Sequence, residues 1–81
     1  MIRIIRAFPL PDYSLKLKFN TGEEKILDMK EILKKPIFSK LLDPEIFSHV
    51  SIDEIAGTVV WPGGIDLCPE TVYEQSELIE N

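Results

Sequence analysis

The chain has 81 residues, of which 44% are apolar and 28% are charged, and its formal net charge is −5. This length favours a single domain, with enough apolar residues to form a core without disulfides or bound metal. The one cysteine argues against a disulfide-stapled secreted protein. No apolar run approaches about 18 residues, and the first six residues interleave charge with isoleucine. We therefore expect neither a signal peptide nor a membrane span, and a cytoplasmic protein.

The charges are segregated along the chain. All nine Lys and Arg residues lie between Arg3 and Lys40 together with five acids, so residues 1–40 carry +4. Residues 41–81 hold nine acids and no Lys or Arg, and therefore carry −9. Either the two halves interdigitate and pair their charges, or the fold presents an anionic face to a basic protein partner. Scattered and outnumbered basic residues disfavour nucleic acid as a partner.

Residues 2–8 are predicted to form a first strand, with Ile4 and Phe8 on one face and Ile5 on the other. Because apolar side chains lie on both faces, we expect this strand not to be an edge open to water. Pro9 is expected to break it, since proline offers no backbone N–H to a neighbouring strand.

Residues 13–19 give the clearest strand, because apolar side chains alternate strictly with polar ones. The following Asn-Thr-Gly sequence predicts a hairpin loop with Gly22 in a left-handed conformation. The chain then returns as an antiparallel strand over residues 24–27, which places Leu27 opposite Leu15.

A helical excursion is predicted next. Asp28, followed three residues later by Glu31, fits a capping box and predicts a short helix through residue 33 or 34. Pro36 breaks this helix and opens another turn. Three apolar residues should share one face of that turn: Phe38, Leu41 and Leu42. Asp43-Pro44 repeats the combination of cap and proline and begins a further single turn.

Two more strands are expected, over residues 50–52 and 58–61. An acidic helix should run from Pro69 to about Glu77, with residues 78–81 as a frayed acidic end. The predicted fold class is α+β: a small, mainly antiparallel sheet, made of a three-stranded meander and a second hairpin, with two or three short helices. Residues 1–77 are expected to form this one domain.

The stretch from Trp61 to Pro69 holds the only tryptophan, the only cysteine and two of the four glycines. Gly63 and Gly64 can adopt positive φ and reverse the chain. Asp66 could accept backbone N–H groups of the turn or of the coming helix, and Pro69 suits a first helical position. We predict that these five residues form a structural motif.

Aromatic side chains near this motif allow two interpretations. Trp61, Phe38 and Phe47 form either part of the core, the default for a chain this small, or an aromatic platform for a ligand.

Catalytic chemistry is weakly indicated. Cys68 precedes the last helix, whose dipole lowers the pKa of a thiol, and His49 is the only histidine that could act as its base. The acids Asp66 and Glu70 would instead raise that pKa. The sequence lacks a nucleophile signature, metal-ligand spacing and a phosphate loop, so we predict no catalytic, metal-binding or cofactor-binding residues and no cofactor. An enzyme is disfavoured.

Several segments occur in a characteristic order. They are Phe19-Asn20-Thr21-Gly22-Glu23, Ile26-Leu27-Asp28, the stretch from Phe47 to Asp53, and above all Trp61-Pro62-Gly63-Gly64-Ile65-Asp66-Leu67-Cys68-Pro69-Glu70. In this order the chain resembles the small bacterial domain-of-unknown-function family 2442 over roughly residues 2–75. The resemblance implies an α+β fold, a bacterial cytoplasmic origin and no established activity. Members are often encoded beside another small domain, which suggests a toxin–antitoxin component.

Three hypotheses follow. The first is a non-catalytic protein-interaction or regulatory module, for example an antitoxin-like partner of a basic protein, with Glu70, Glu74 and Glu77 as the contact surface. The second is a self-associating protein, a homo-oligomer that pairs sheet edges or oppositely charged halves. The third is a small enzyme or metabolite binder with a pocket near Trp61.

Overall fold

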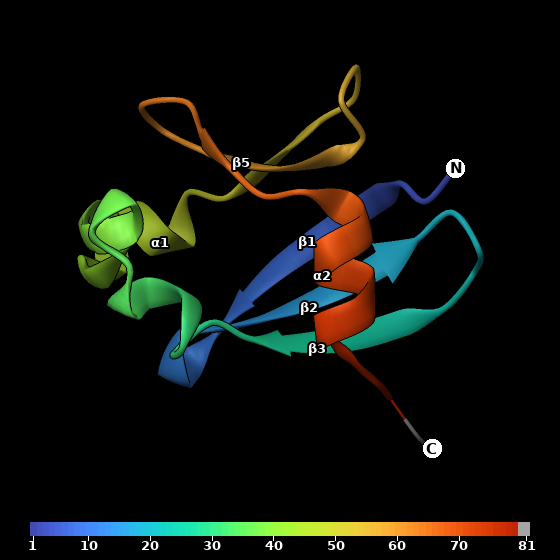
Figure 1. Cartoon of the computed structure of the whole chain (residues 1–81), viewed down its shortest axis with the longest axis horizontal. Helices are drawn as coiled ribbons and strands as arrows, with labels where there is room; N and C mark the ends of the chain where they lie inside the picture. The colour runs from blue at the N-terminus through green and yellow to red at the C-terminus, as the bar shows by residue number, and fades with distance from the viewer. Residues whose placement is uncertain (80–81) are drawn as a thin grey trace.

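The computed structural model describes residues 1–79 and contains two antiparallel sheets (Figure 1). The first sheet has the strand order β1-β2-β3-β7, and the second has the order β4-β5-β6. The strands are β1 (Ile4–Leu10), β2 (Ser14–Phe19), β3 (Glu24–Asp28), β4 (Ser51–Asp53), β5 (Thr58–Trp61), β6 (Ile65–Asp66) and β7 (Glu77–Leu78). The predicted α+β class is confirmed.

Within residues 1–79, five short helical segments connect and cover the sheets. They are the 3₁₀ helices η1 (Pro11–Tyr13), η2 (Ile32–Lys34) and η3 (Pro36–Leu42) and the α-helices α1 (Pro44–Ser48) and α2 (Pro69–Gln75). In Figure 1, α2 crosses in front of β2 and β3, the second sheet lies above the first, and η3 and α1 lie to the left. No helix within residues 1–79 is long and apolar enough to cross a bilayer.

The core lies between the two sheets and α2. The strict alternation of β2 buries Leu15, Leu17 and Phe19 completely, and their polar neighbours face outward. The other buried apolar residues are Ile4, Leu27, Met29, Leu33, Leu41, Phe47, Val59, Trp61 and Val72. Apolar side chains from every layer therefore converge on one cluster.

The first hairpin confirms its predicted register. Leu15 is paired with Leu27 across β2 and β3. Gly22 has φ +90°, and its amide donates to the Phe19 carbonyl oxygen at 3.0 Å. The loop therefore requires a residue that tolerates positive φ.

The prediction that the first strand avoids an exposed edge is wrong. β1 is the outermost strand of its sheet and continues through Pro9 to Leu10, which an edge strand permits. The register shifts between Ile4 and Arg6, as at a β-bulge, so Ile4 faces inward while Phe8 faces outward. Because of this shift, inward-facing and outward-facing side chains do not show along β1 the strict alternation expected from the sequence.

The predicted capping box is also wrong. Asp28 is the last residue of β3, and its Oδ1 accepts the Lys30 amide at 2.9 Å, which closes a local turn instead of capping a helix. The following segments are 3₁₀ helices, and Leu42 is exposed instead of sharing a buried face with Leu41. By contrast, the Asp43 cap is confirmed, because its Oδ1 accepts the Glu45 amide at 3.0 Å.

The last helix is shorter than predicted. α2 ends at Gln75, and Glu77 and Leu78 form β7, which pairs with β3. The Ile79 amide donates to the Glu24 carbonyl oxygen at 3.0 Å. The open edge of β3 supplies the backbone partners that hold this segment. Glu80 and Asn81, the rest of the predicted frayed end, lie outside the described residues.

Candidate functional site

Trp61 ends β5 inside the core. Its side chain is 2% exposed, its Nε1–H donates to the Phe47 carbonyl oxygen at 3.0 Å, and its ring lies 6.1 Å from the Phe47 ring. The rings of Phe47 and Tyr13 pack in a T-shaped arrangement, with their centroids 5.3 Å apart. Trp61 is therefore part of the core and offers no open aromatic surface to a ligand. Phe47 and Tyr13 line a hollow of about 380 Å³ between the start of η1 and α1.

The rest of the motif forms the bend that follows. Gly63 and Gly64 have φ of +92° and +81°, and the Gly64 amide donates to the Trp61 carbonyl oxygen at 3.1 Å. Pro69 is the first residue of α2, as predicted. The Asp66 carboxylate is exposed and accepts no hydrogen bond within the described residues, so it caps neither the turn nor the helix.

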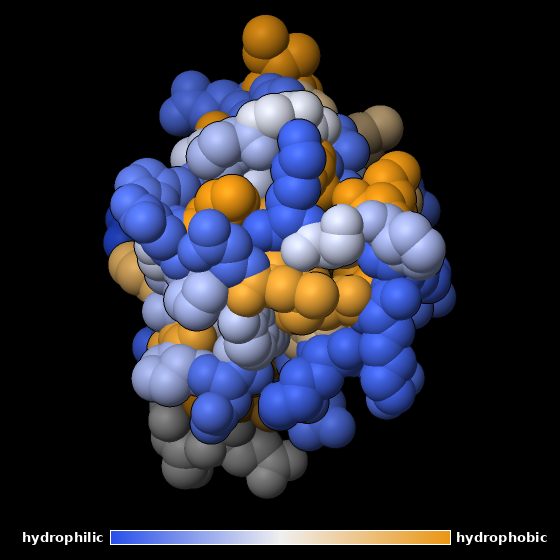
Figure 2. All heavy atoms as spheres, turned by 90° about the vertical axis from the view of Figure 1, so that its left-hand side faces the viewer, coloured by the Kyte–Doolittle hydropathy of each residue, from blue (hydrophilic) through white to orange (hydrophobic). Residues whose placement is uncertain are grey.

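Phe38 lies apart from the other two aromatics, at the surface. It lines two adjoining hollows of about 200 and 290 Å³, one toward α2 and one toward the Gly63-Gly64 bend. Asp66 lies on both, and Ile32, Leu67 and Val72 supply apolar walls to the first. Figure 2 views the side of the molecule on which η3 and α1 lie, and apolar side chains surface there among polar ones.

Cys68 is the N-cap residue of α2 and is exposed. The backbone and hydroxyl of Thr71, and then the Glu70 amide, lower the pKa of the Cys68 thiol below its ordinary value. The Glu70 carboxylate raises this pKa, as predicted for a neighbouring acid, but by less than the hydrogen bonds lower it.

The predicted base lies elsewhere. The His49 Nδ1 lies 2.6 Å from the Glu45 carbonyl oxygen at the end of α1, and no hydrogen bond joins His49 to Cys68 in the described part of the chain. Within residues 1–79, no group of three or more His, Cys, Asp and Glu side chains is placed to hold a metal ion. The structure therefore does not assemble the parts of a cysteine nucleophile.

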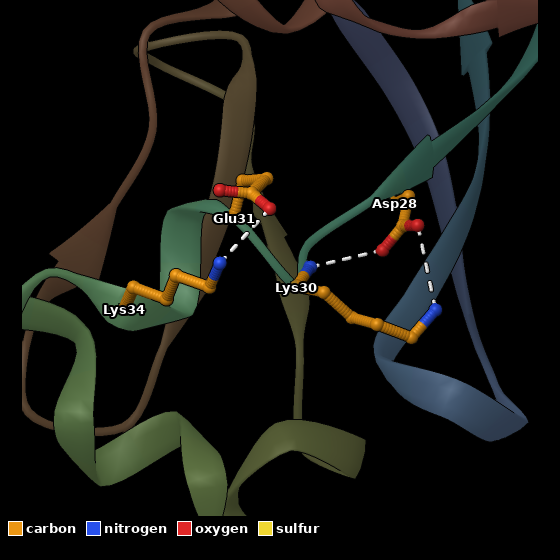
Figure 3. A network of polar contacts seen from close by, with 4 residues as sticks. All are labelled: Asp28, Lys30, Glu31 and Lys34. Carbon is orange, nitrogen blue, oxygen red and sulfur yellow. Dashed lines mark hydrogen bonds and ion pairs between the residues drawn. The ribbon is translucent and has the colours of Figure 1, made fainter.

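The ion pairs do not join the two charged halves. Within residues 1–79 there are three pairs, and all of them lie in the first half: Lys16–Glu24 at 3.8 Å, Lys30–Asp28 at 3.4 Å and Lys34–Glu31 at 3.1 Å. Figure 3 shows the last two at the end of β3 and in the segment that follows it. Each pair is exposed and adds little to stability. Among the described residues, no carboxylate of the second half lies within ion-pair distance of a basic group.

Contacts between the halves use carbonyl groups and a ring instead. The Arg3 guanidinium donates to the backbone carbonyl oxygens of Glu54 and Ile55. The buried Lys25 ammonium donates to the Tyr73 carbonyl oxygen at 2.8 Å and lies 3.7 Å from the centre of the Tyr73 ring. Arg3 and Lys25 thus contact the second half without forming ion pairs with its acids.

A hydrogen bond also links α2 to the first hairpin. The Tyr73 hydroxyl donates to Glu23 Oε1 at 2.6 Å. This bond lowers the pKa of the Glu23 carboxyl and raises the pKa of the Tyr73 hydroxyl, because it stabilises the charged carboxylate and the neutral phenol.

The three predicted partner-contact acids do not form one surface. Glu70 and Glu74 are exposed on α2, one helical turn apart. Glu77 has left the helix and lies in β7 opposite Ile26, on the face of the first sheet that points away from the core.

Sequence reasoning missed this outward face. The hairpin register already implies that the polar residues of β2 face the same way as Glu24 and Ile26 of β3. The available signal was the strict alternation of residues 14–19 combined with the position of Gly22, which together determine which side chains are cross-strand neighbours.

The fold occurs in a protein of known structure. The chain is similar to the crystal structure of the "Putative DNA Binding Protein" from Nitrosomonas europaea, with 31% sequence identity and a TM-score of 0.82. The alignment covers 94% of this chain but only 49% of the other, so this chain spans about half the length of that protein. No curated protein matches the chain. The family model described as "Protein of unknown function (DUF2442)" matches residues 4–77, and the chain therefore belongs to the DUF2442 family.

Proposed function

We propose that this protein is a non-catalytic protein-interaction module whose acidic second half binds a basic protein. A regulatory role of the antitoxin kind, in which the module covers a basic partner, is included in this proposal. The observation that carries it is that no second-half carboxylate within residues 1–79 forms an ion pair with the nine Lys and Arg side chains.

Unpaired exposed carboxylates leave a negative potential outside the molecule. Residues 41–81 carry nine acids and no Lys or Arg. Charges of one sign attract a basic partner over about 8–10 Å at physiological ionic strength and raise its association rate. Basic side chains of the partner can then form ion pairs with carboxylates that have no ion pair within their own chain.

The contact is proposed at α2. Glu70 and Glu74 are exposed and lie one helical turn apart, so a basic side chain could contact both. Glu77 lies on the outward face of the first sheet and contributes to the general field more than to this contact. The exposed thiol of Cys68, beside the same helix, suits a reducing compartment, which supports a cytoplasmic location.

The test compares two charge reversals of equal size. The bound partner is first isolated from the native cell, and its association rate is then measured from low to high salt. Glu74→Lys should slow association and flatten its salt dependence, whereas Glu31→Lys should leave both nearly unchanged. Glu31 is a suitable control because it is exposed, belongs to the first half of the chain and forms an ion pair with Lys34. Equal effects of the two variants, or an acidic partner, would refute the proposal.

DNA binding is a second candidate, suggested only by the description of the Nitrosomonas protein. That protein is about twice as long, and the part without a counterpart here could account for the description. The net charge of −5 opposes contact with phosphates. We expect no binding of duplex DNA in fluorescence anisotropy even at low salt, and salt-sensitive binding would revive this candidate.

A further inference from the structure

The outward face of the first sheet carries an ordered charge pattern. Antiparallel pairing places directly opposed residues on the same side of a sheet. From β1 towards β7, the outward rows are Arg6, Lys18 and Glu24; Phe8, Lys16, Ile26 and Glu77; and Leu10, Ser14 and Asp28. The opposite face packs on the core and on α2, which crosses it in Figure 1.

Positive and negative side chains occupy different halves of this face. The strands β1 and β2 contribute three cations and no acid, whereas β3 and β7 contribute three acids and no cation. Arg6 lies directly opposite Lys18, an arrangement of like charges that costs stability in a monomer. Within the described residues, Arg6 and Lys18 have no ion-pair partner, and neither does Glu77.

Two apolar side chains lie between the charges. Phe8 is 52% exposed and Ile26 is 39% exposed, and they flank Lys16 from the two neighbouring strands. A sheet face that is open to water ordinarily carries polar side chains at such positions. The face thus combines two exposed apolar side chains, one on each side of Lys16, with unpaired cations towards β1 and an unpaired acid in β7.

We propose that this face binds the same face of a second copy of the chain, in a two-fold symmetric dimer. Two identical faces can pack on each other symmetrically only when the two-fold axis lies in the plane of the interface. An axis parallel to the strands places β1 and β2 of one copy over β3 and β7 of the other, so cations meet acids. An axis across the strands would place cations on cations. Charge therefore selects the first axis, which gives an aligned packing of two sheets.

In this arrangement Lys18 of each copy faces Glu24 of the second copy, and Arg6 lies above the strand that carries Glu77. In the middle row Phe8 lies over the strand that carries Glu77 of the second copy, and Lys16 lies over Ile26. Arg6 and Lys18 thereby come close to acids of the second copy, whereas neither forms an ion pair within its own chain among the described residues.

The size of the face determines the strength of the dimer. Four strands about 4.8 Å apart and about five residues long give a face of roughly 19 by 17 Å. Two such faces cover roughly 650 Å² in total, which is below the about 1,000 Å² of a specific, stable interface. We expect a weak dimer that dissociates on dilution and in high salt.

Other occupants fit the face less well. One alternative is that the acidic helix α2 of a second copy binds the basic half of this face. Since α2 covers the opposite side of the same sheet, this contact would be head to tail. Repeated contacts of this kind would join the copies into open chains. A polyanion such as nucleic acid would meet Glu24, Asp28 and Glu77 together with the cations. Only a partner with the same divided pattern pairs both halves.

Complementary charge reversal tests the proposal. One variant, Arg6→Glu with Lys18→Glu, makes the face acidic, and another, Glu24→Lys with Glu77→Lys, makes it basic. Sedimentation equilibrium is measured from about 10 µM to about 1 mM protein at low and high salt, a range in which a small interface dissociates. We expect each variant alone to dimerise at least tenfold more weakly than the wild type, and an equimolar mixture of the two to form a heterodimer.

The control variant Glu70→Lys with Glu74→Lys changes the net charge as much as the basic variant does but leaves the sheet face intact, so it should dimerise like the wild type. It alters the surface proposed for the basic partner, so the two proposals can fail separately.

Circular dichroism establishes that each variant is folded. If the charge variants do not fold, Phe8→Ala tests the dimer instead, and we expect this variant to dimerise about tenfold more weakly than the wild type. A wild type that stays monomeric up to about 1 mM, or a mixture that forms no heterodimer, would overturn the dimer.

Discussion

At the scale of single residues, Trp61 combines two interactions that can be separated. Its ring fills the core beside Phe47, and its N–H satisfies the Phe47 carbonyl oxygen. Trp61→Phe keeps an aromatic ring but leaves that carbonyl oxygen unpaired, at a cost of about 1–3 kcal/mol. Trp61→Ala also leaves a cavity and should cost about 3–5 kcal/mol. Urea denaturation followed by circular dichroism measures both, and a loss below about 1 kcal/mol for Trp61→Ala would contradict the core role.

The bond between Tyr73 and Glu23 predicts how stability depends on pH. The folded-state pKa of Glu23 lies below its ordinary value of 4.5, so its stabilisation is present above that value and is lost as the pH falls through the folded pKa. The folded-state pKa of Tyr73 lies above 10.0, so its stabilisation is present below 10.0 and is lost as the pH rises through the folded pKa.

Tyr73→Phe removes this bond. We expect a lower urea midpoint at neutral pH and a shallower loss of stability at both ends of the pH range. Thr21→Ala provides a comparison, because the Thr21 hydroxyl donates to the same carboxylate oxygen and should affect only the acid side. An unchanged alkaline limb in Tyr73→Phe would mean that the hydroxyl is not bound to Glu23 in solution.

At the scale of elements, two glycines with positive φ differ in their surroundings. A Cβ at Gly22 would meet no atom within 4 Å, whereas a Cβ at Gly57 would lie 2.8 Å from Cζ of Arg3. Gly22→Ala should therefore lower the free energy of unfolding only by the strain of alanine in a left-handed conformation, about 1–2 kcal/mol. Gly57→Ala costs the same conformation and also displaces Arg3, so its loss should be larger.

Thermal and urea denaturation of the two alanine variants measure this difference. If Gly22→Ala is as destabilising as Gly57→Ala, the Arg3 contact contributes nothing. If Gly22→Ala costs nothing, the first hairpin turns by another geometry in solution.

At the scale of the whole molecule, Arg3 links the two sheets. Its guanidinium donates to two carbonyl oxygens in the turn between β4 and β5, and the neighbouring Ile4 amide donates to the Gly57 carbonyl oxygen at 2.8 Å. We expect Arg3→Ala to cost about 1–3 kcal/mol and Arg3→Lys to restore little, because an ammonium group cannot reproduce the guanidinium fork.

A double-mutant cycle gives the sharper test. In Gly57→Ala with Arg3→Ala the two losses should not add, because the first change already displaces the guanidinium. Additive losses, measured by urea denaturation of the four proteins, would show that Arg3 and Gly57 act independently.

Much of this molecule follows from the sequence alone. Alternation over residues 14–19 and the glycine of the first loop determine the first hairpin. Pro62 determines the end of β5, and Pro69 determines the start of α2. These features depend on backbone geometry within a few residues, where proline and glycine permit few alternatives. The Asp43 cap is local in the same sense.

The tertiary structure decides what depends on distant partners. Residues 77–79 pair with β3 because the edge of β3 is open. No local sequence pattern in the acidic end predicts this pairing. The shift beside Ile4 turns Phe8 outward, and the register of β1 places Arg6 against Lys18. For the same reason, charge counts along the chain did not reveal which acids remain unpaired, since pairing is a matter of distance in the folded chain and not of position in the sequence.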